Sequence, residues 1–155
     1  MSGVSMSHMS KNKTYQKESN LCREPSARYL EMATRMDKRR TIKDPDGYGK
    51  RTGECGDTVE MFLIVRKNSI HSVSFITDGC INTHACANCV AFLAEGKSMA
   101  EAWEITPEKV IDFLETLPEE HTHCAELAVG AFYLALVNFQ EFKHAPWKRL
   151  YGKRR

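Results

Sequence analysis

Three cysteines occupy positions where the sequence pattern changes from one kind of element to another. Cys80 follows an Asp-Gly pair at the point where an alternating apolar run stops and a helix-like run rich in small residues begins. At a helix N-terminus, unpaired backbone N–H groups and the positive end of the helix dipole favour thiolate over thiol. Cys55 stands just before a predicted strand and Cys124 just before a long apolar helix. The three thiols are therefore candidate ligands or nucleophiles that can converge in space.

Two polar neighbours could complete a metal site. Asp57 lies two positions after Cys55, and His123 directly precedes Cys124. Three soft thiolates with one carboxylate or imidazole suit either tetrahedral zinc or an iron-sulfur cluster with one non-cysteine ligand. The cysteine spacings of 25 and 44 residues match no local zinc-finger pattern. Since a free cysteine is also commonly a small buried core residue, the residues alone leave both interpretations open.

Four segments resemble, in their order and spacing, the IscU/NifU-type iron-sulfur cluster assembly scaffolds. They read Gly-Glu-Cys-Gly-Asp at 53–57, Asp-Gly-Cys at 78–80, Gly-Lys-Ser at 96–98 and His-Cys at 123–124. The likeness covers about residues 27–140 and is specific, because three cysteines, an aspartate and a histidine fall in place together.

The resemblance implies a scaffold rather than an enzyme. In this family the matching cysteines receive sulfur from a cysteine desulfurase and hold a transient [2Fe-2S] cluster, built from iron and sulfide, for transfer to apo-proteins. The aspartate makes the cluster labile, and the histidine can ligate metal. By resemblance these roles fall on Cys55, Cys80, Cys124, Asp57 and His123. Cys124 and Cys80 are the candidate persulfide acceptors, and either Asp57 or His123 is the fourth ligand.

The alternative is a zinc-bearing sulfur-transfer protein of the SufU type, which accepts persulfide on one cysteine. The same ligand set, the three cysteines with either Asp57 or His123, fits tetrahedral zinc. However, the chain has no long insertion between Cys80 and Cys124, unlike the zinc-containing branch, so the cluster scaffold is the closer likeness.

The chain departs from the family pattern in two places. Residues 117–121 read Leu-Pro-Glu-Glu-His, where the family often has a Leu-Pro-Pro-Val-Lys segment that a dedicated Hsp70-type chaperone grips. His84, Cys86 and Cys89 stand where the family usually has small or apolar residues. These three are expected either to be core residues or to supply an auxiliary thiol or ligand.

The elements that must position these residues follow from periodicity. Runs 57–66 and 70–77 alternate in the way of an antiparallel hairpin with one buried face. Helices are expected at 27–36, 80–95, 97–104, 107–117 and 124–142, and an exposed connection at 37–50. This order predicts an α+β fold, a small antiparallel sheet packed against several helices as in the IscU-like sandwich. The predicted domain spans 25–145, after a disordered segment 1–24 and before a basic tail 146–155.

Composition and charge limit the classes of function. No run of 18 apolar residues exists and the N-terminus lacks a signal-peptide core, which predicts a cytoplasmic protein that does not enter membranes. In a reducing compartment six cysteines favour metal binding or catalysis over disulfides. Residues 51–142 carry 5 Lys or Arg against 14 Asp or Glu, whereas both ends are basic. The tail has little aromatic interleaving, which argues against nucleic acid as a partner.

The expected partners are a cysteine desulfurase and apo-proteins that accept the cluster, with a homodimer as a further option. Complementary charge speeds such encounters more than it tightens them. We expect basic residues of the first helix and its connection to contribute to desulfurase docking: Arg28, Arg35, Lys38, Arg39 and Arg40. The tail is expected to be secondary, through Lys148, Arg149, Lys153, Arg154 and Arg155.

Overall fold

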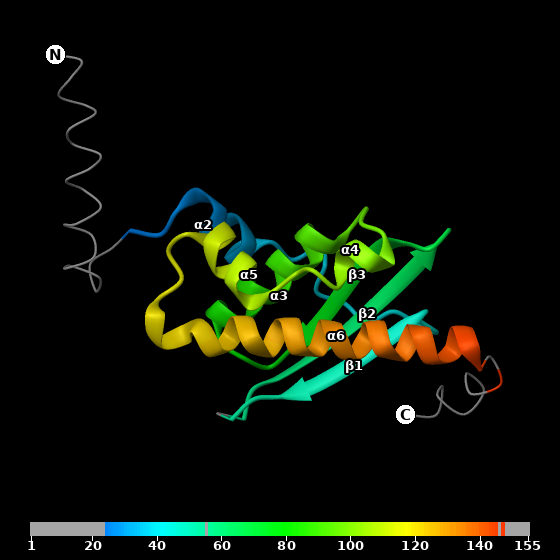
Figure 1. The fold of residues 1–155 in the computed structure, drawn as a ribbon. Helices are drawn as coiled ribbons and strands as arrows, with labels where there is room; N and C mark the ends of the chain where they lie inside the picture. Colours follow the sequence, from blue (N-terminus) through cyan, green and yellow to red (C-terminus); the bar gives the residue numbers. More distant parts are fainter. Residues whose placement is uncertain (1–23, 55, 146, 148–155) are drawn as a thin grey trace, which may run out of the picture.

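A computed structural model of the protein describes residues 24–54, 56–145 and 147. Figure 1 shows one sheet with helices packed across it. Within the described ranges the elements run in the order α2 (Ala27–Thr34), β1 (Gly47–Thr52), β2 (Thr58–Arg66), β3 (Ser69–Thr77), α3 (Ile81–Ala94), α4 (Met99–Ala102), α5 (Pro107–Leu114), the 3-10 helix η2 (Glu119–His121) and α6 (Thr122–His144). The predicted α+β class is confirmed.

The sheet is antiparallel, with its strands in the order β1-β2-β3. Met61 in β2 lies opposite Gly49 in β1 and Phe75 in β3, so these three residues share one face. Met61 and Phe75 are fully buried. Helix α6 packs mainly on β1 and β2, and α3 packs on β3 (Figure 1). The predicted hairpin of two strands is therefore confirmed, with its buried face under the helices.

Strand β1 was missed by the sequence prediction, which treated residues 37–50 as an exposed connection. The strand contains Gly47 and Gly49, whose missing side chains hide the apolar alternation that identifies a strand. A Cβ atom on Gly49 would collide with the backbone of α6 at Ala131 and Ala135. Glycine at this position therefore allows the long helix to lie directly on the strand.

Side-chain caps start three of the helices. Ser26 Oγ accepts a hydrogen bond from Tyr29 N–H at 3.0 Å and starts α2. Ser98 forms a capping box that starts α4, and Thr106 caps α5 ahead of a proline at its first position. In the described part of the chain, α3 and α6 begin differently, at Cys80 and His121, which make no side-chain capping hydrogen bond.

Helix α6 is the central helix of the fold. The helical stretch Glu119–His144 is long and apolar enough, by length and composition alone, to cross a membrane. Half of its most apolar window is buried inside the protein, where the helix packs against β1, β2 and α3. Such burial is the behaviour of a core helix, and it accounts for the apolar composition without a lipid contact.

Candidate metal centre

The first turns of α3 and α6 bring two of the predicted ligands together. The Sγ atoms of Cys80 and Cys124 and one ring nitrogen of His121 all lie within 4.8 Å of one another. Cys80 is exposed and Cys124 is buried, with 1% of its surface accessible. The site therefore opens to the surface on the Cys80 side and is closed on the Cys124 side.

Thr83 connects the two thiols. Its hydroxyl donates a hydrogen bond to Cys124 Sγ at 3.3 Å and lies 3.9 Å from Cys80 Sγ. On the other side of Cys80, the side-chain amide of Asn82 donates to Cys80 Sγ at 3.8 Å. The phenol of Tyr29 in turn donates to Asn82 Oδ1 at 2.5 Å and orients that amide. Both sulfur atoms thus have donors that can stabilise negative charge.

The two thiols differ in their affinity for a proton. Burial opposes ionisation of Cys80, but the backbone N–H groups and side chains of Thr83 and Asn82 outweigh it, so the pKa of Cys80 lies below its usual value. Burial raises the pKa of Cys124 to about 11; the hydrogen bond from Thr83 opposes this, and negative charge on Cys80 and Asp57 adds to it. Cys80 is consequently the more readily ionised thiol of the pair.

Asp57 lies beside the paired cysteines without joining their closest group. A Cβ atom placed on Gly79 would stand 3.0 Å from Asp57 Oδ2 and 2.7 Å from Thr83 Oγ1. Glycine before Cys80 therefore leaves room for both side chains. The loop that carries Asp57 is closed by a hydrogen bond from Gly53 N–H to Asp57 O at 2.8 Å. Cys55 belongs to this loop in the sequence, but it lies outside the described residues. Cys22, near the N-terminus, also lies outside them.

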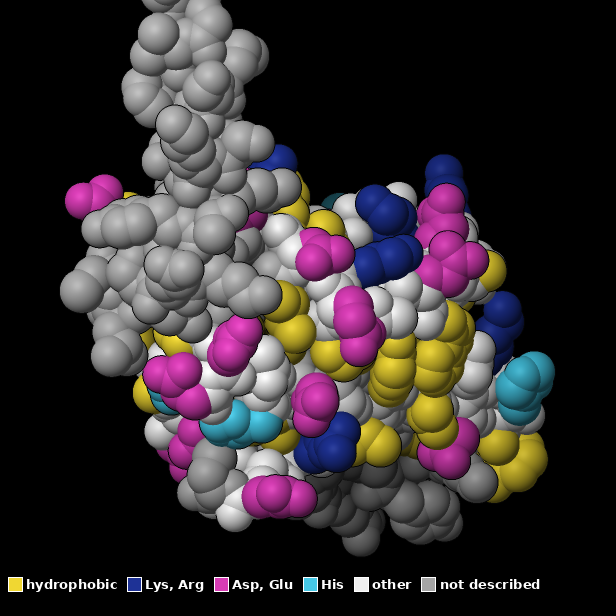
Figure 2. All heavy atoms as spheres, turned by 60° about the vertical axis from the view of Figure 1, so that its left-hand side comes forward, with side chains coloured by type: hydrophobic (Ala, Val, Ile, Leu, Met, Phe, Trp, Pro, Cys, Tyr) yellow, Lys and Arg dark blue, Asp and Glu magenta, His cyan; other side chains and the backbone are white. Residues whose placement is uncertain are grey.

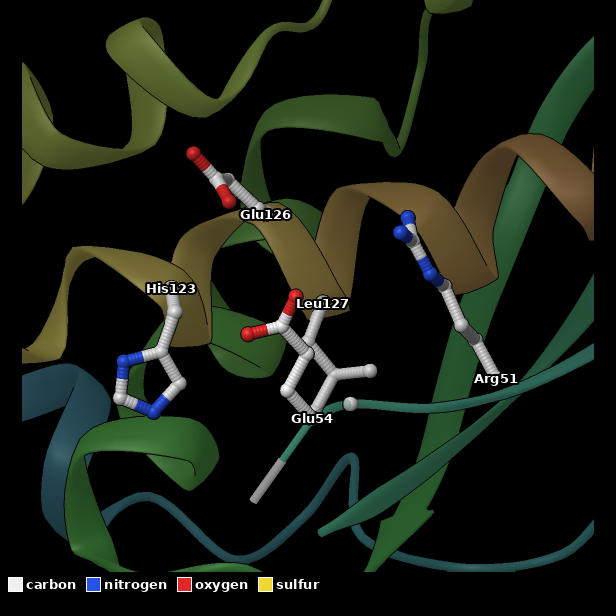
Figure 3. A pocket seen from close by; sticks show the side chains of 6 residues that line it. Arg51, Glu54, His123, Glu126 and Leu127 are labelled. Atoms are coloured by element: carbon white, nitrogen blue, oxygen red, sulfur yellow. The ribbon is translucent and has the colours of Figure 1, made fainter. Parts of the chain in front are cut away.

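His123, the predicted histidine ligand, lies on the other flank of Cys124. Its Nε2 atom is 3.7 Å from Cys124 Sγ. The side chain lines a cavity of about 380 Å³ together with Arg51, Gly53, Glu54, Glu126 and Leu127. Figure 3 shows His123 extending from the first turn of α6 and Glu54 from the loop before the position of Cys55. His123 thus faces the 53–57 loop.

His121 is the residue of the centre that sequence reasoning missed. It ends η2, and its ring centroid lies 6.0 Å from that of His123. The spacing of three residues between His121 and Cys124 was the available signal, because residues three apart are neighbours on a helical turn. The family pattern drew attention to His123 instead.

Cys86 and Cys89 belong to the core. Both are fully buried in α3, and Cys89 Sγ lies 3.9 Å from Val110 O as a donor. Burial raises the pKa of Cys89 to about 12 and that of Cys86 well above its usual value. His84 is also buried, with Nε2 2.8 Å from Arg35 O. The sequence left open whether these three residues are core residues or supply an auxiliary thiol or ligand. Their burial supports the role of core residues.

Acidic side chains are spread over the face of the molecule shown in Figure 2. Two further acidic residues, Glu119 and Glu120, belong to the 3-10 helix that leads to His121. The acidic charge expected for the body of the chain therefore extends to the neighbourhood of the centre, where it favours the approach of cations.

Comparison with known proteins identifies relatives of the sequence and of the fold. The sequence model described as "NifU-like N terminal domain" matches residues 37–145. The "Iron-sulfur cluster assembly scaffold protein IscU 1" of Archaeoglobus fulgidus is 34% identical over 99 residues, which cover 63% of this chain and 65% of that protein. The "Nitrogen fixation protein NifU" of a Nostoc species is 27% identical over 88 residues, 56% of this chain and 29% of that protein.

Solved structures share the fold at low sequence identity. A NifU-like N-terminal structure from Brucella abortus superposes with a TM-score of 0.63 at 16% identity, covering 75% of this chain and 94% of the other. A putative iron-sulfur cluster assembly scaffold protein for the SUF system from Fervidobacterium islandicum has a TM-score of 0.62 at 19% identity, covering 72% and 95%. The α+β sandwich expected from the sequence is therefore an architecture that solved proteins share.

Proposed function

Because the chain belongs to the NifU-like N-terminal domain family, we propose that it is a scaffold on which an iron-sulfur cluster is assembled and then passed to apo-proteins. The observation that carries the proposal is the pair of Cys80 and Cys124, whose sulfur atoms lie within 4.8 Å and share the Thr83 hydroxyl. The Archaeoglobus relative is named as an iron-sulfur cluster assembly scaffold protein, which agrees with this role.

Iron and sulfide are the cargo of the proposed scaffold. Cys80 and Cys124 supply two thiolates for iron, and Cys55, on the loop closed by Gly53 and Asp57, is proposed as the third. Asp57 or His123 completes the ligand set. A fourth ligand that is weaker than a thiolate has a purpose here, because four thiolates would retain the cluster and hinder its transfer.

Cys80 is proposed as the first sulfur acceptor from a cysteine desulfurase. Cys80 is an exposed residue, and its thiol ionises more readily than that of Cys124. The Cys80 thiolate attacks the terminal sulfur of the desulfurase persulfide, a new sulfur–sulfur bond forms on Cys80, and the desulfurase thiolate leaves. Reduction of the bound sulfur to sulfide then takes two electrons from an external reductant.

Anaerobic reconstitution tests the function. Metal-free protein is supplied with ferrous iron, cysteine, a reductant and a desulfurase, and cluster formation is followed by visible absorption and circular dichroism. We expect a cluster chromophore in the wild type and in the matched control Cys89→Ala, which loses a buried thiol outside the centre. We expect none in Cys80→Ser/Cys124→Ser. A chromophore of equal yield in the double variant would show that the site is assigned wrongly.

A zinc-bearing persulfide acceptor is the second candidate. The compact group of Cys80, His121 and Cys124 favours it, because two sulfur ligands and one nitrogen ligand suit tetrahedral zinc with one position left for a substrate. Elemental analysis of protein purified without air separates the two functions. One zinc ion per chain that stays bound through repeated turnover with the desulfurase would support the zinc protein; zinc that iron displaces would support the scaffold.

A further inference from the structure

Polar contacts hold helix α2 against α3 at both ends of α2. Where α2 ends, Asn88 Nδ2 donates to Met32 O at 2.7 Å and to Arg35 O at 2.8 Å. Near its start, the Tyr29 hydroxyl donates to Asn82 Oδ1 at 2.5 Å. Both asparagines are buried in α3, with 1% and 9% of their surfaces accessible. Because hydrogen bonds are directional, these contacts fix where α2 lies on α3 more narrowly than apolar packing alone would.

The Asn82 amide joins one of these contacts to the centre. Its Nδ2 atom donates to Cys80 Sγ at 3.8 Å, while its Oδ1 atom accepts from Tyr29. Among the described residues, these are the hydrogen bonds that the side chain of Asn82 makes. A side-chain amide has one donating end and one accepting end. The bond to the phenol therefore selects which end of the amide faces the sulfur atom.

The phenol keeps the proton that it donates. Burial raises the pKa of Tyr29, and negative charge on the thiols Cys86, Cys80 and Cys124 adds to this. Without the hydroxyl, the amide is free to turn by half a rotation and to present its oxygen to the sulfur. The partial negative charge of that oxygen opposes a thiolate, whereas an N–H group stabilises it. Tyr29 thus acts on Cys80 through Asn82.

We propose that Tyr29 is a positioning residue through which the seating of α2 controls the reactivity of Cys80 as a sulfur acceptor. The proposal rests on the scaffold function and adds a regulatory contact to it. When α2 is seated on α3, the amide donor of Asn82 points at Cys80 and sulfur transfer is fast. When a partner lifts α2, the hydroxyl leaves with the helix and the transfer slows. A helix 53 residues earlier in the sequence can therefore report docking to the thiol.

The substitution Tyr29→Phe tests the contact, because it keeps the ring and removes the hydroxyl. Alkylation of Cys80 by iodoacetamide is measured at pH 7 on the metal-free full-length protein by peptide mass spectrometry. We expect the rate to fall about fivefold. The matched control Tyr133→Phe loses a hydroxyl that donates to Ile105 O, and it should keep about the wild-type rate. An unchanged rate in Tyr29→Phe would overturn the proposal.

A double-mutant cycle separates positioning from packing. Asn82→Ala removes the donor directly and should slow alkylation of Cys80 by about fivefold or more. Adding Tyr29→Phe to Asn82→Ala should cause no further loss, because the hydroxyl acts only through the amide. A second fivefold loss in the double variant would show that Tyr29 acts by packing and would overturn the proposal. If Tyr29→Phe does not fold, as judged by circular dichroism, an unchanged rate in Asn82→Ala overturns it instead.

NMR of the Asn82 side chain gives a readout that a purely structural role would not change. The side-chain NH₂ signals of Asn82 should exchange slowly with water in the wild type and in Tyr133→Phe. They should exchange faster in Tyr29→Phe, where the amide loses the bond that holds it. Equal exchange in the three proteins would mean that the hydroxyl does not hold the amide, and the proposal would fail.

Sulfur transfer distinguishes failure of this inference from failure of the proposed function. Transfer from a persulfide-loaded desulfurase in a single turnover should also be about fivefold slower in Tyr29→Phe. Slower alkylation in this variant, with a wild type that accepts no sulfur, removes the function and leaves the positioning contact. Equal alkylation in variant and wild type, with a wild type that accepts sulfur and builds clusters, removes the contact and leaves the function.

Discussion

Proton affinity distinguishes two cysteines that are neighbours in space. The donors of Thr83 and Asn82 lower the pKa of Cys80, whereas burial raises that of Cys124 to about 11. Since the thiolate is the reacting form, a thiol with a pKa near 11 is only about one part in 10⁴ ionised at pH 7. The order in which the two thiols react is therefore set before any metal or partner is bound.

Alkylation of metal-free protein checks this order. We expect iodoacetamide to modify Cys80 at least a hundredfold faster than Cys124 at pH 7. The rate at Cys124 should rise about tenfold per pH unit until the pH approaches 11, because the thiolate fraction rises in that proportion. Peptide mass spectrometry as a function of pH measures both rates. Preferential modification of Cys124 at neutral pH would contradict the assignment of Cys80 as first acceptor.

Buried Cys89 makes stability depend on alkaline pH. Its pKa is raised from 9.0 to about 12 in the folded state, so its contribution to stability is complete below pH 9 and is lost as the pH rises toward 12. At pH 10 the loss is about 1.4 kcal/mol, because the unfolded chain ionises there and the folded chain does not.

The substitution Cys89→Ala removes that titration. The variant should be less stable than the wild type at pH 7, since it loses buried volume. The difference in unfolding free energy between the two proteins should shrink by about 1.4 kcal/mol between pH 7 and pH 10. Urea titrations at both pH values measure it. Parallel pH profiles would mean that Cys89 ionises in the folded protein as freely as in the unfolded chain.

At the scale of elements, the contact between β1 and α6 depends on a missing side chain. The position of a Cβ atom on Gly49 is already occupied by the backbone of α6. Gly49→Ala should therefore lower the free energy of unfolding by about 3 kcal/mol, the upper end of the range for overpacked cores. The control Lys50→Ala, exposed on the same strand, should change it by less than about 0.5 kcal/mol. Equal urea midpoints for the two variants would show that the helix can move away.

The same strand shows what sequence reasoning can and cannot reach. Elements with their own local signal were predicted: the helices expected at 27–36 and 107–117 begin at Ser26 and Thr106, whose side-chain oxygens accept a backbone N–H, and the alternating apolar runs 57–66 and 70–77 form β2 and β3. Strand β1 has no such signal, because its buried positions are glycines. The need for glycine there becomes visible only when α6 is packed against the strand. The predicted end of the last helix at residue 142 is two residues short of its observed end at His144.

Prediction of the centre has a similar limit. The pairing of Cys80 with Cys124 follows from helix starts that can be recognised in the sequence. The sequence predicted His123 as the histidine of the centre, but His121 is the one grouped with Cys80 and Cys124. This difference depends on the turn made by η2, which fixes where each ring lies. The domain limits 25–145 and the roles of Cys55, Asp57 and His123 stay predictions.

At the scale of the whole molecule, the basic cluster expected to dock a desulfurase is largely occupied by internal contacts. Arg35 pairs with Asp37 at 2.6 Å, Lys38 pairs with Glu95, and Arg39 donates to Thr77 O at 2.6 Å. Arg28 lies over the ring of Phe113, 4.7 Å from its centroid. Neutralising the cluster as a block would therefore alter the fold as well as the charge.

Arg40, exposed at the end of this segment, is the informative position. Arg40→Gln should lower the rate of association with the desulfurase about twofold at low ionic strength and make that rate less dependent on salt. Stability should change by less than about 0.5 kcal/mol. Stopped-flow measurement over a salt series, with Lys67→Gln on the exposed β2–β3 turn as the control, checks this. An unchanged rate would return Arg40 to the role of a solvated surface charge.

Among the described α-helices, α3 and α6, which present the thiols, are those whose first turns have no side-chain oxygen cap; at the start of α3 the only side-chain acceptor for backbone N–H groups is the Cys80 sulfur. A missing cap costs a helix about 1 kcal/mol, so the first turns of α3 and α6 should open more often than those of α2 and α5. Amide hydrogen exchange should be fastest there in the metal-free protein and should slow when cobalt is bound. A bound metal ion or cluster would then hold these two turns closed. An acceptor protein that opens the turns would release it.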